Sequence, residues 1–104
     1  MKDPATEPAS FEVLGDERSR VVGSLDFATV SALLPAGSDA INRGQASVID
    51  LNGVTSSDSS GLALLIEWMS VAKYARRTLR FENVPSQLYQ LARLSEVEEL
   101  LAAG

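Results

Sequence analysis

Short apolar runs mark the first structured part of the sequence. Phe11 to Leu14 and Arg20 to Val22 predict two strands, and Gly15-Asp16-Glu17 between them is typical of a hairpin turn. Residues 1–10 lack such a pattern, and we expect a short disordered lead-in there. Residues 11–104 then form a single domain, because a chain of 104 residues builds one core and not two.

Helical spacing follows the second predicted strand. Ser24 and Asp26 are both candidate caps for the start of this helix. Its apolar side consists of Val30, Leu33, Leu34 and Ile41. Pro35 interrupts the pattern, so we expect the helix to kink or to restart there.

The second half of the chain alternates strands with helices. Ser47 to Leu51 predicts a central strand that ends in a turn at Asn52-Gly53. After a polar loop, the strongest helical pattern covers about Ser60 to Ala75, and Leu79 to Val84 predicts another strand.

Two serines are the expected caps of two C-terminal helices. Ser86 follows Pro85 and precedes a helical apolar pattern, and Ser95 precedes a last short helix over Val97, Leu100 and Leu101. Strands that alternate with helices predict the α/β class. We expect a sandwich with a mixed sheet of four to five strands and about four helices packed on it.

A turn rich in hydroxyl groups joins the central strand to the long helix. It contains Asp58, Ser59, Ser60 and Gly61, and it lies where open α/β sheets usually carry their sites. Free N–H groups at a helix start favour an anion, and Gly61 keeps the backbone approachable. The alternative is plain helix capping, which contributes about 1 kcal/mol. A carboxylate pair with Asp50 is conceivable, but Asp50 is as well explained as a structural hydrogen-bond acceptor.

The long helix is more apolar than a surface helix requires. Its apolar arc spans about 220°, against the roughly 100° needed to pack on one sheet. Only Glu67, Ser70 and Tyr74 form a polar strip. Either neighbouring helices bury the excess, or an apolar patch that includes Leu64 and Trp68 stays exposed as a protein-binding site.

Composition excludes several classes of function. The sequence has no cysteine and no histidine, so it lacks a thiolate metal site, the commonest general base and the usual partner of a serine nucleophile. We expect that the protein is not an enzyme and that it binds neither a metal nor a cofactor. The net charge of −5 argues against nucleic acid and against adsorption to an anionic membrane. No run reaches the roughly 18 apolar residues of a membrane span, so we expect a cytoplasmic protein without direct membrane insertion.

Two segments together resemble the signature of the STAS domain family. They are Val48 to Val54 and the Asp58-Ser59-Ser60-Gly61 turn with the Leu62 to Leu65 segment that follows it, and Gly23 to Asp26 is similar to an earlier element of the family. The resemblance implies an interaction module of the anti-sigma factor antagonist type. In that branch the serine after the aspartate is phosphorylated, a role that maps onto Ser59 and would place about −2 charges on a docking surface.

A narrower resemblance is to the MlaB branch of this family. It rests on Leu62 to Leu65, Ala72-Lys73 and above all Asn83 to Leu94. This branch implies a cytoplasmic subunit of the Mla phospholipid ABC transporter of Gram-negative bacteria, which maintains outer-membrane lipid asymmetry. The implied partner is the ATPase subunit, MlaF, and through it the membrane permease. We expect the turn and the helix that follows it at that contact, through Asp58, Ser59, Ser60, Gly61, Leu64 and Trp68. Ser59 is then either a phosphorylated switch or a hydrogen-bonding contact.

Overall fold

The computed structural model describes residues 9–97 and 101 of the chain. Its elements follow the order β1 (Ser10–Gly15), β2 (Arg18–Leu25), α1 (Phe27–Asn42), β3 (Val48–Ser57), α2 (Ser59–Tyr74), β4 (Arg80–Glu82) and α3 (Ser86–Leu94). Residues 1–8 of the expected lead-in lie outside the described residues. Ser10, which was assigned to the lead-in, is the first residue of β1.

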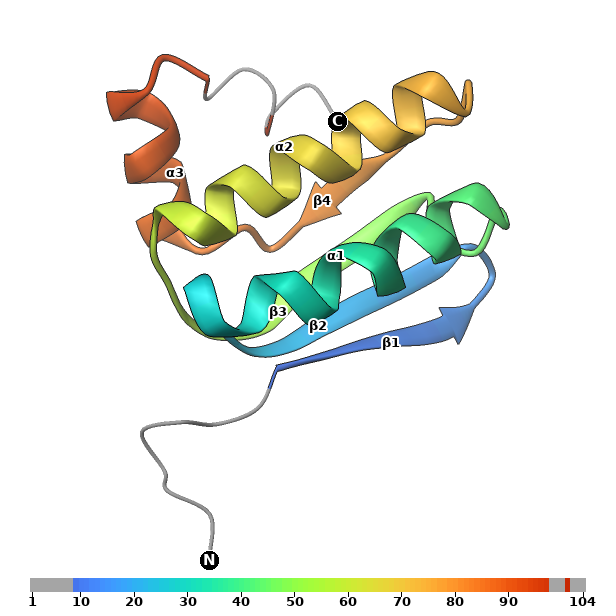
Figure 1. Ribbon diagram of the computed structural model, residues 1–104, viewed down its shortest axis with the longest axis horizontal. Helices are drawn as coiled ribbons and strands as arrows, with labels where there is room; N and C mark the ends of the chain where they lie inside the picture. Colours follow the sequence, from blue (N-terminus) through green and yellow to red (C-terminus); the bar gives the residue numbers. More distant parts are fainter. Residues whose placement is uncertain (1–8, 98–100, 102–104) are drawn as a thin grey trace, which may run out of the picture.

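One mixed sheet organises the molecule. Its strand order is β1-β2-β3-β4, with β1 antiparallel to β2 and the other neighbours parallel. Helices α1 and α2 lie side by side over one face of the sheet and run in the same direction (Figure 1). This arrangement confirms the predicted α/β sandwich with a mixed sheet of four strands. The described residues form three helices, against the expected number of about four.

The predicted hairpin turn joins β1 to β2. Asp16 and Glu17, its two central residues, both have a positive φ, of 53° and 60°. Two central residues in this conformation match the right-handed twist of the flanking strands, and aspartate tolerates it better than most residues. The turn therefore sets the register in which Phe11 faces Val21.

Alternation along the strands separates a core face from an open face. In β2, Val21 and Leu25 are fully buried, whereas Arg20 is exposed. The largest fully buried side chains are Trp68, Leu25, Ile41, Ile49, Leu51, Leu65 and Leu88. Each contributes about 1.5–3 kcal/mol relative to exposure. The buried Ser19 hydroxyl donates to the carbonyl of Gln45 at 3.1 Å, so its burial leaves no polar atom without a partner.

Strand β3 continues through the point where a turn was expected. The strand runs to Ser57, and its register with β2 shifts between Asp50 and Gly53. An ideal Cβ on Gly53 would lie 3.0 Å from Val22 Cγ2, so the glycine permits a close approach of the two strands at a bulge. The Asn52-Gly53 pair therefore marks a bulge, and the turn prediction was wrong.

Helix α1 is continuous past Pro35, so the expected restart is absent. Of the two candidate caps, Asp26 is the one used: its Oδ1 accepts from the N–H groups of Ala28 and Thr29 at 2.9 and 3.1 Å. The Thr29 hydroxyl in turn accepts from the N–H of Asp26 at 3.0 Å, which completes a capping box.

The C-terminal elements are shorter than predicted. Strand β4 has only three residues, because Asn83 with a φ of 56° turns the chain away from the sheet. Pro85 occupies the cap position of α3 and makes no side-chain capping bond, so the assignment of Ser86 as the cap was wrong. Ser95 is the C-cap of α3. Most of the last helix expected after it, over Val97, Leu100 and Leu101, lies outside the described residues.

Candidate functional site

The Asp58 turn is held rigidly at the start of α2. Asp58 Oδ1 accepts from the N–H of Ser60 at 2.8 Å, and the Asp58 carbonyl accepts from the N–H of Gly61 at 3.0 Å. The N–H of Asp58 donates to the carbonyl of Leu25 at 3.1 Å, which ties the turn to the end of β2. Asp58 is thus a helix cap, as the simpler interpretation of the turn proposed.

Gly61 faces inward and not toward solvent. The residue is buried, and an ideal Cβ there would lie 2.1 Å from Ser57 Oγ and 2.9 Å from Leu25 Cβ. The first turn of α2 therefore packs directly on the ends of β2 and β3, which requires glycine. The expectation that Gly61 keeps the turn approachable from outside was wrong, because the side of Gly61 that lacks a side chain faces the interior of the protein.

Ser59 and Ser60 carry hydroxyl groups that the described part of the protein does not use. Ser59 is exposed and Ser60 is half-buried. Neither hydroxyl makes a hydrogen bond to a described residue, although the Ser60 N–H is bonded to Asp58. A hydroxyl without an internal partner, on a backbone that is fixed, is available to a partner molecule without rearrangement of the turn.

A second helix starts at the same end of the molecule. Because β2 and β3 are parallel, α1 and α2 both begin at the carboxyl edge of the sheet, on the left in Figure 1. The hydroxyls of Ser24 and Ser56 lie 2.7 Å apart and join the two strand ends. Asp26 and Asp58 cap the two helices that start just beyond these strand ends. The site is therefore a surface built from two strand ends and two helix starts.

Phe27 supplies an apolar side chain that sequence reasoning missed. It is the first residue of α1, directly after the cap Asp26, and its exposed fraction is 85%. It was not among the residues assigned to the apolar side of this helix. The signal that could have identified it is its position next to a cap, where the first helical turn extends beyond the sheet. Exposed aromatic residues of this kind are common at protein-binding surfaces.

Leu64 and Trp68 lie in the core. Their exposed fractions are 2% and 0%. The Trp68 indole packs edge-on against Phe11, with ring centroids 5.5 Å apart, and its Nε1 donates to the carbonyl of Leu34 at 3.2 Å. The expectation of an exposed apolar patch that includes Leu64 and Trp68 was wrong, because the neighbouring elements bury that part of α2.

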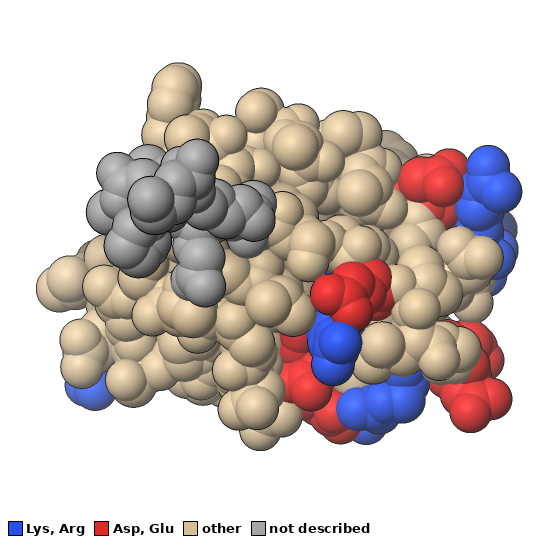
Figure 2. All heavy atoms as spheres, turned by 90° about the horizontal axis from the view of Figure 1, so that it is seen from below, with Lys and Arg blue, Asp and Glu red and all other residues tan. Residues whose placement is uncertain are grey.

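The outer side of α2 is the predicted polar strip. Glu67 and Tyr74 are both exposed on this helix, and the exposed fraction of Tyr74 is 89%. On the face seen in Figure 2, charged side chains gather toward the end where α1 and α2 finish. The end where the two helices begin shows mostly uncharged atoms on that face.

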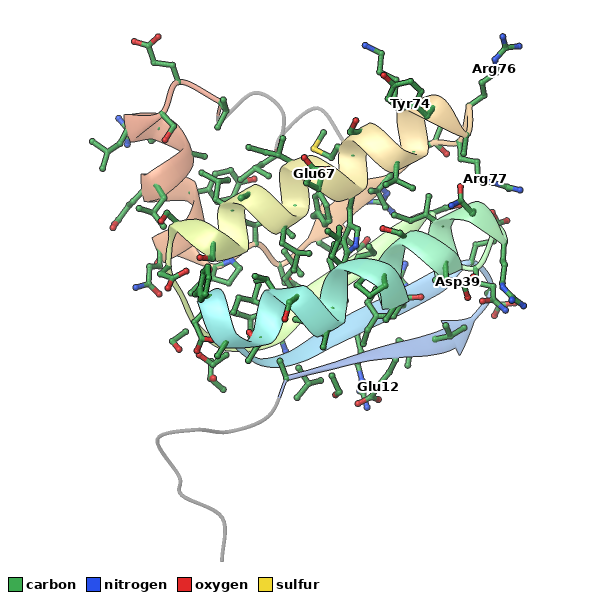
Figure 3. The ribbon with its side chains drawn as sticks, in the orientation of Figure 1. Glu12, Asp39, Glu67, Tyr74, Arg76 and Arg77 are labelled. Carbon is green, nitrogen blue, oxygen red and sulfur yellow. The ribbon has the colours of Figure 1, made fainter. Side chains whose placement is uncertain are left out.

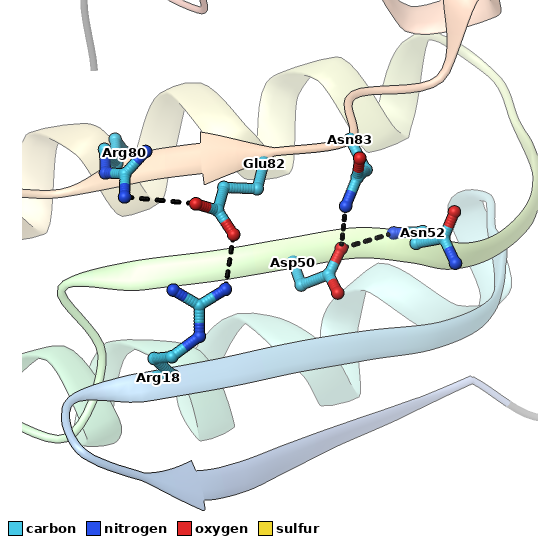
Figure 4. Close-up of polar contacts among 6 residues, drawn as sticks. All are labelled: Arg18, Asp50, Asn52, Arg80, Glu82 and Asn83. Atoms are coloured by element: carbon cyan, nitrogen blue, oxygen red, sulfur yellow. Dashed lines mark hydrogen bonds and ion pairs between the residues drawn. The ribbon is translucent and has the colours of Figure 1, made fainter.

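Asp50 belongs to a separate polar cluster on the open face of the sheet (Figure 4). Its Oδ1 accepts from Asn83 Nδ2 and from the N–H of Asn52, both at 2.9 Å. These two hydrogen bonds, with smaller contributions from Arg18 and Arg20, lower the pKa of Asp50 below its ordinary value. Asp50 is therefore a structural acceptor, and a catalytic pair with Asp58 is not formed.

Two properties of the described residues bear on the kind of site. Within residues 9–97 and 101, no group of three or more acidic, histidine or cysteine residues is placed to hold a metal ion. No helix in the same part of the chain is both long enough and apolar enough to cross a membrane.

Solved structures with the same fold include two of SpoIIAA, one described as an anti-sigma factor antagonist and the other as a Bacillus protein. The unphosphorylated form is 21% identical with a TM-score of 0.64, over 83% of this chain and 82% of that one. The phosphorylated form, described as a cell fate determinant, is 22% identical with a TM-score of 0.64, over 86% and 84% of the two chains. At this identity the likeness shows a common fold. A comparison with curated protein sequences gave no match.

A family model supplies the closer relationship. The model described as "Mlab, STAS domain" matches residues 16–102, which include every helix and all strands except β1. That range contains both segments on which the sequence resemblance rested, and the fold agrees with it. The chain therefore belongs to the STAS domain family, in the group whose model carries the name of MlaB.

Proposed function

We propose that this chain is a non-catalytic accessory subunit that binds and regulates the ATPase of an Mla-type phospholipid ABC transporter. The observation that carries the proposal is exposed Ser59, whose hydroxyl makes no hydrogen bond to a described residue and which lies on a rigid turn of an MlaB-type STAS domain. The docking surface, as we define it, consists of Asp58, Ser59 and Ser60 with Phe27.

Rigidity of the turn favours tight docking. Asp58 makes one hydrogen bond through its side chain and three through its backbone N–H and carbonyl, which hold the backbone of Ser59 and Ser60 in place before any partner arrives. A preorganised surface loses little conformational entropy on binding, so more of the contact free energy appears as affinity. Phe27 adds an apolar anchor beside these polar contacts.

The same geometry supports a binding role over a catalytic one. The sequence contains no histidine that could activate Ser59 as a nucleophile. The nearest acidic residue in the chain, Asp58, uses Oδ1 to cap α2, and Asp26 uses Oδ1 to cap α1. Both carboxylates therefore serve helix starts, and Ser59 has no base aimed at it among the described residues.

Regulation follows from differential binding. A subunit shifts the conformational population of its partner only if it binds one state more tightly than the other. A domain that fits the docked state of the ATPase would stabilise that state of the transporter. Location at the inner membrane would then come from the partner and not from this chain.

Co-purification tests this proposal directly. The tagged full-length chain, expressed in its native host, is isolated from detergent-solubilised membranes, and the bound proteins are identified by mass spectrometry. We expect an ABC ATPase in stoichiometric amount, accompanied by its permease. A preparation whose dominant partner is a soluble anti-sigma factor contradicts the transporter assignment.

The second candidate is an anti-sigma factor antagonist switched by phosphorylation of Ser59. It is favoured by the fold shared with SpoIIAA, for which both unphosphorylated and phosphorylated forms are described. Ser59 is exposed, and it directly follows the cap of α2. Intact-mass measurement of native protein tests this candidate: a stoichiometric phosphate that Ser59→Ala removes supports it, and unmodified protein under all growth conditions opposes it.

A further inference from the structure

Three cationic side chains gather at the far end of α2. Lys73, Arg76 and Arg77 are all exposed, and none of them makes an ion pair with a described residue. Figure 3 shows Arg76 and Arg77 together at the end where α2 finishes. Other arginines do have acidic partners: Arg18, Arg20 and Arg80 in the sheet, and Arg43 at the C-cap of α1. Among residues 9–97 and 101, Lys73, Arg76 and Arg77 thus gather positive charge without an ion pair at one end of the molecule, in a chain whose net charge is −5.

The backbone at Arg76 is unfavourable for arginine. Arg76 has a φ of 57°, and the N–H of Arg77 reaches back to the carbonyl of Ala72 at 2.9 Å, so α2 ends in a Schellman motif with Arg76 as its left-handed residue. At the equivalent position of α1 the chain uses Gly44, with a φ of 74°. A left-handed conformation costs a non-glycine residue about 1–2 kcal/mol. Arg76 therefore places a positive charge at a position where glycine would make the protein more stable.

Compensation of the helix dipole does not require all three cations. Such compensation comes from the last turn of a helix and contributes typically about 0.3–1 kcal/mol. Lys73 already occupies the last turn of α2. Arg77 reaches toward the end of α1 instead, because its Nη1 would lie 2.9 Å from an ideal Cβ on Gly44. Arg76 projects from the end of α2 without either role.

A surface hollow adjoins these cations. It has a volume of about 460 Å³ and is lined by Ser70, Lys73, Tyr74 and Arg76. Tyr74 is 89% exposed, so its ring and hydroxyl are open to a ligand. The hollow therefore combines two positive charges with two hydroxyl groups, a set that suits carboxylate groups: arginine binds carboxylate through paired N–H donors, and hydroxyls add hydrogen bonds.

We propose that Lys73, Tyr74 and Arg76, with Ser70, form a second docking site that binds an acidic peptide segment of a protein partner. A short peptide segment suits the site because it can place a few carboxylates in the hollow without covering the negatively charged remainder of this protein. An anionic membrane or a nucleic acid would extend over the negatively charged remainder of the molecule and be repelled.

The site is spatially separate from the docking surface at Ser59. α2 has 16 residues, and a rise of about 1.5 Å per residue places its two ends roughly 24 Å apart. The inference therefore holds whichever partner binds at the Ser59 end. One chain could then contact two parts of an assembly through the opposite ends of a single helix.

A titration with a defined peptide tests the site. The full-length chain, labelled with ¹⁵N, is titrated with acetyl-hexaglutamate amide at low salt, and amide chemical shifts are followed. We expect shifts concentrated on residues 70–78. Peptide binding should be at least fivefold weaker in 0.3 M NaCl, because salt screens the attraction. Acetyl-hexaglutamine amide is the matched neutral probe, and equal shifts with both peptides would overturn the proposal.

Substitution of Arg76 separates a binding role from a structural one. Arg76→Gly removes the charge and relieves the left-handed strain, so we expect a higher melting temperature together with at least threefold weaker binding of hexaglutamate. Arg43→Gln, which removes an exposed arginine paired with Asp39, is the control and should leave binding unchanged. Unchanged binding in Arg76→Gly overturns the proposal. So does retention of the chain on phosphatidylglycerol vesicles without any response to the peptide, which would identify a membrane contact.

Discussion

The indole ring of Trp68 packs so closely on Gly37 that an ideal Cβ there would lie 2.3 Å from Trp68 Cε2. This contact, together with the bond from Trp68 Nε1 to the carbonyl of Leu34, locks α2 against α1. Phe27 is at the start of α1 and Ser59 is at the start of α2, so the packing of the two helices sets the spacing between these two residues of the docking surface.

Gly37→Ala should therefore destabilise the fold. In an open helical position this substitution would add up to about 1 kcal/mol of stability, but here the methyl group clashes with a ring that has no room to move. We expect a net loss of about 1–3 kcal/mol in the free energy of unfolding, measured by urea denaturation. In a Trp68→Phe background the same substitution should cost less, and an equal cost in both backgrounds would contradict the contact.

Asp50 makes the stability of the sheet edge depend on pH. Its pKa is lowered in the folded state, so its contribution is present above the ordinary aspartate pKa, near 3.8, and is lost as the pH falls through the folded value. We expect Asp50→Asn to be less stable than the parent at pH 7 and the difference to shrink below about pH 4. Urea denaturation of both proteins at pH 7 and below about pH 4 measures the difference in the free energy of unfolding. A difference that grows as the pH falls would contradict this prediction. Glu67→Gln, at an exposed position on α2, controls for loss of one negative charge.

Asp58→Ala should weaken the start of α2. The variant loses the side-chain bond to the N–H of Ser60, and loss of such a cap costs about 1 kcal/mol. Because the Asp58 N–H and carbonyl bonds to Leu25 and Gly61 come from the backbone, they should remain. We expect a fully folded protein with a lower urea midpoint. A stability equal to the parent's would show that the cap contributes nothing.

Phe27→Ser should leave stability nearly unchanged and weaken partner binding. Substitution of a side chain that is 85% exposed usually changes stability by less than about 0.5 kcal/mol. By contrast, removal of an aromatic anchor from an interface typically costs more than about 1 kcal/mol of binding free energy. Calorimetry with the partner and thermal melts of the free chain measure the two effects. Leu14→Ser, at a half-exposed position on β1, serves as the control.

Much of the fold could be predicted from the sequence because its signals are local. The hairpin turn at Asp16 and Glu17 depends on neighbouring residues only and was identified correctly. The helix cap is equally local, and Asp26 was one of the two candidates named for it. The bulge at Gly53 was mistaken for a turn, because the pairing of β2 with β3 that needs a glycine there joins residues about 30 positions apart.

The candidate site was predictable only in its polar half. The Asp58 turn is a contiguous motif, so its position could be inferred from the sequence. The exposure of Phe27 and the burial of Trp68 depend on which neighbours cover each helix, and periodicity gives the width of an apolar face without naming what packs on it. Gly37, which makes room for the indole, carries no local signal of that role.

The affinity of Ser59 variants for the partner ATPase tests the central claim most directly. The purified ABC ATPase is titrated with the parent chain, with Ser59→Glu and with Ala36→Glu, which adds the same charge at an exposed position further along α1. A charge placed on a docking surface should be repelled or poorly solvated there, whereas at a helix start it does not harm folding. We predict at least tenfold weaker binding for Ser59→Glu, an unchanged melting temperature, and parent-like binding for Ala36→Glu. Parent-like binding by Ser59→Glu would place the interface elsewhere and contradict the proposed docking surface.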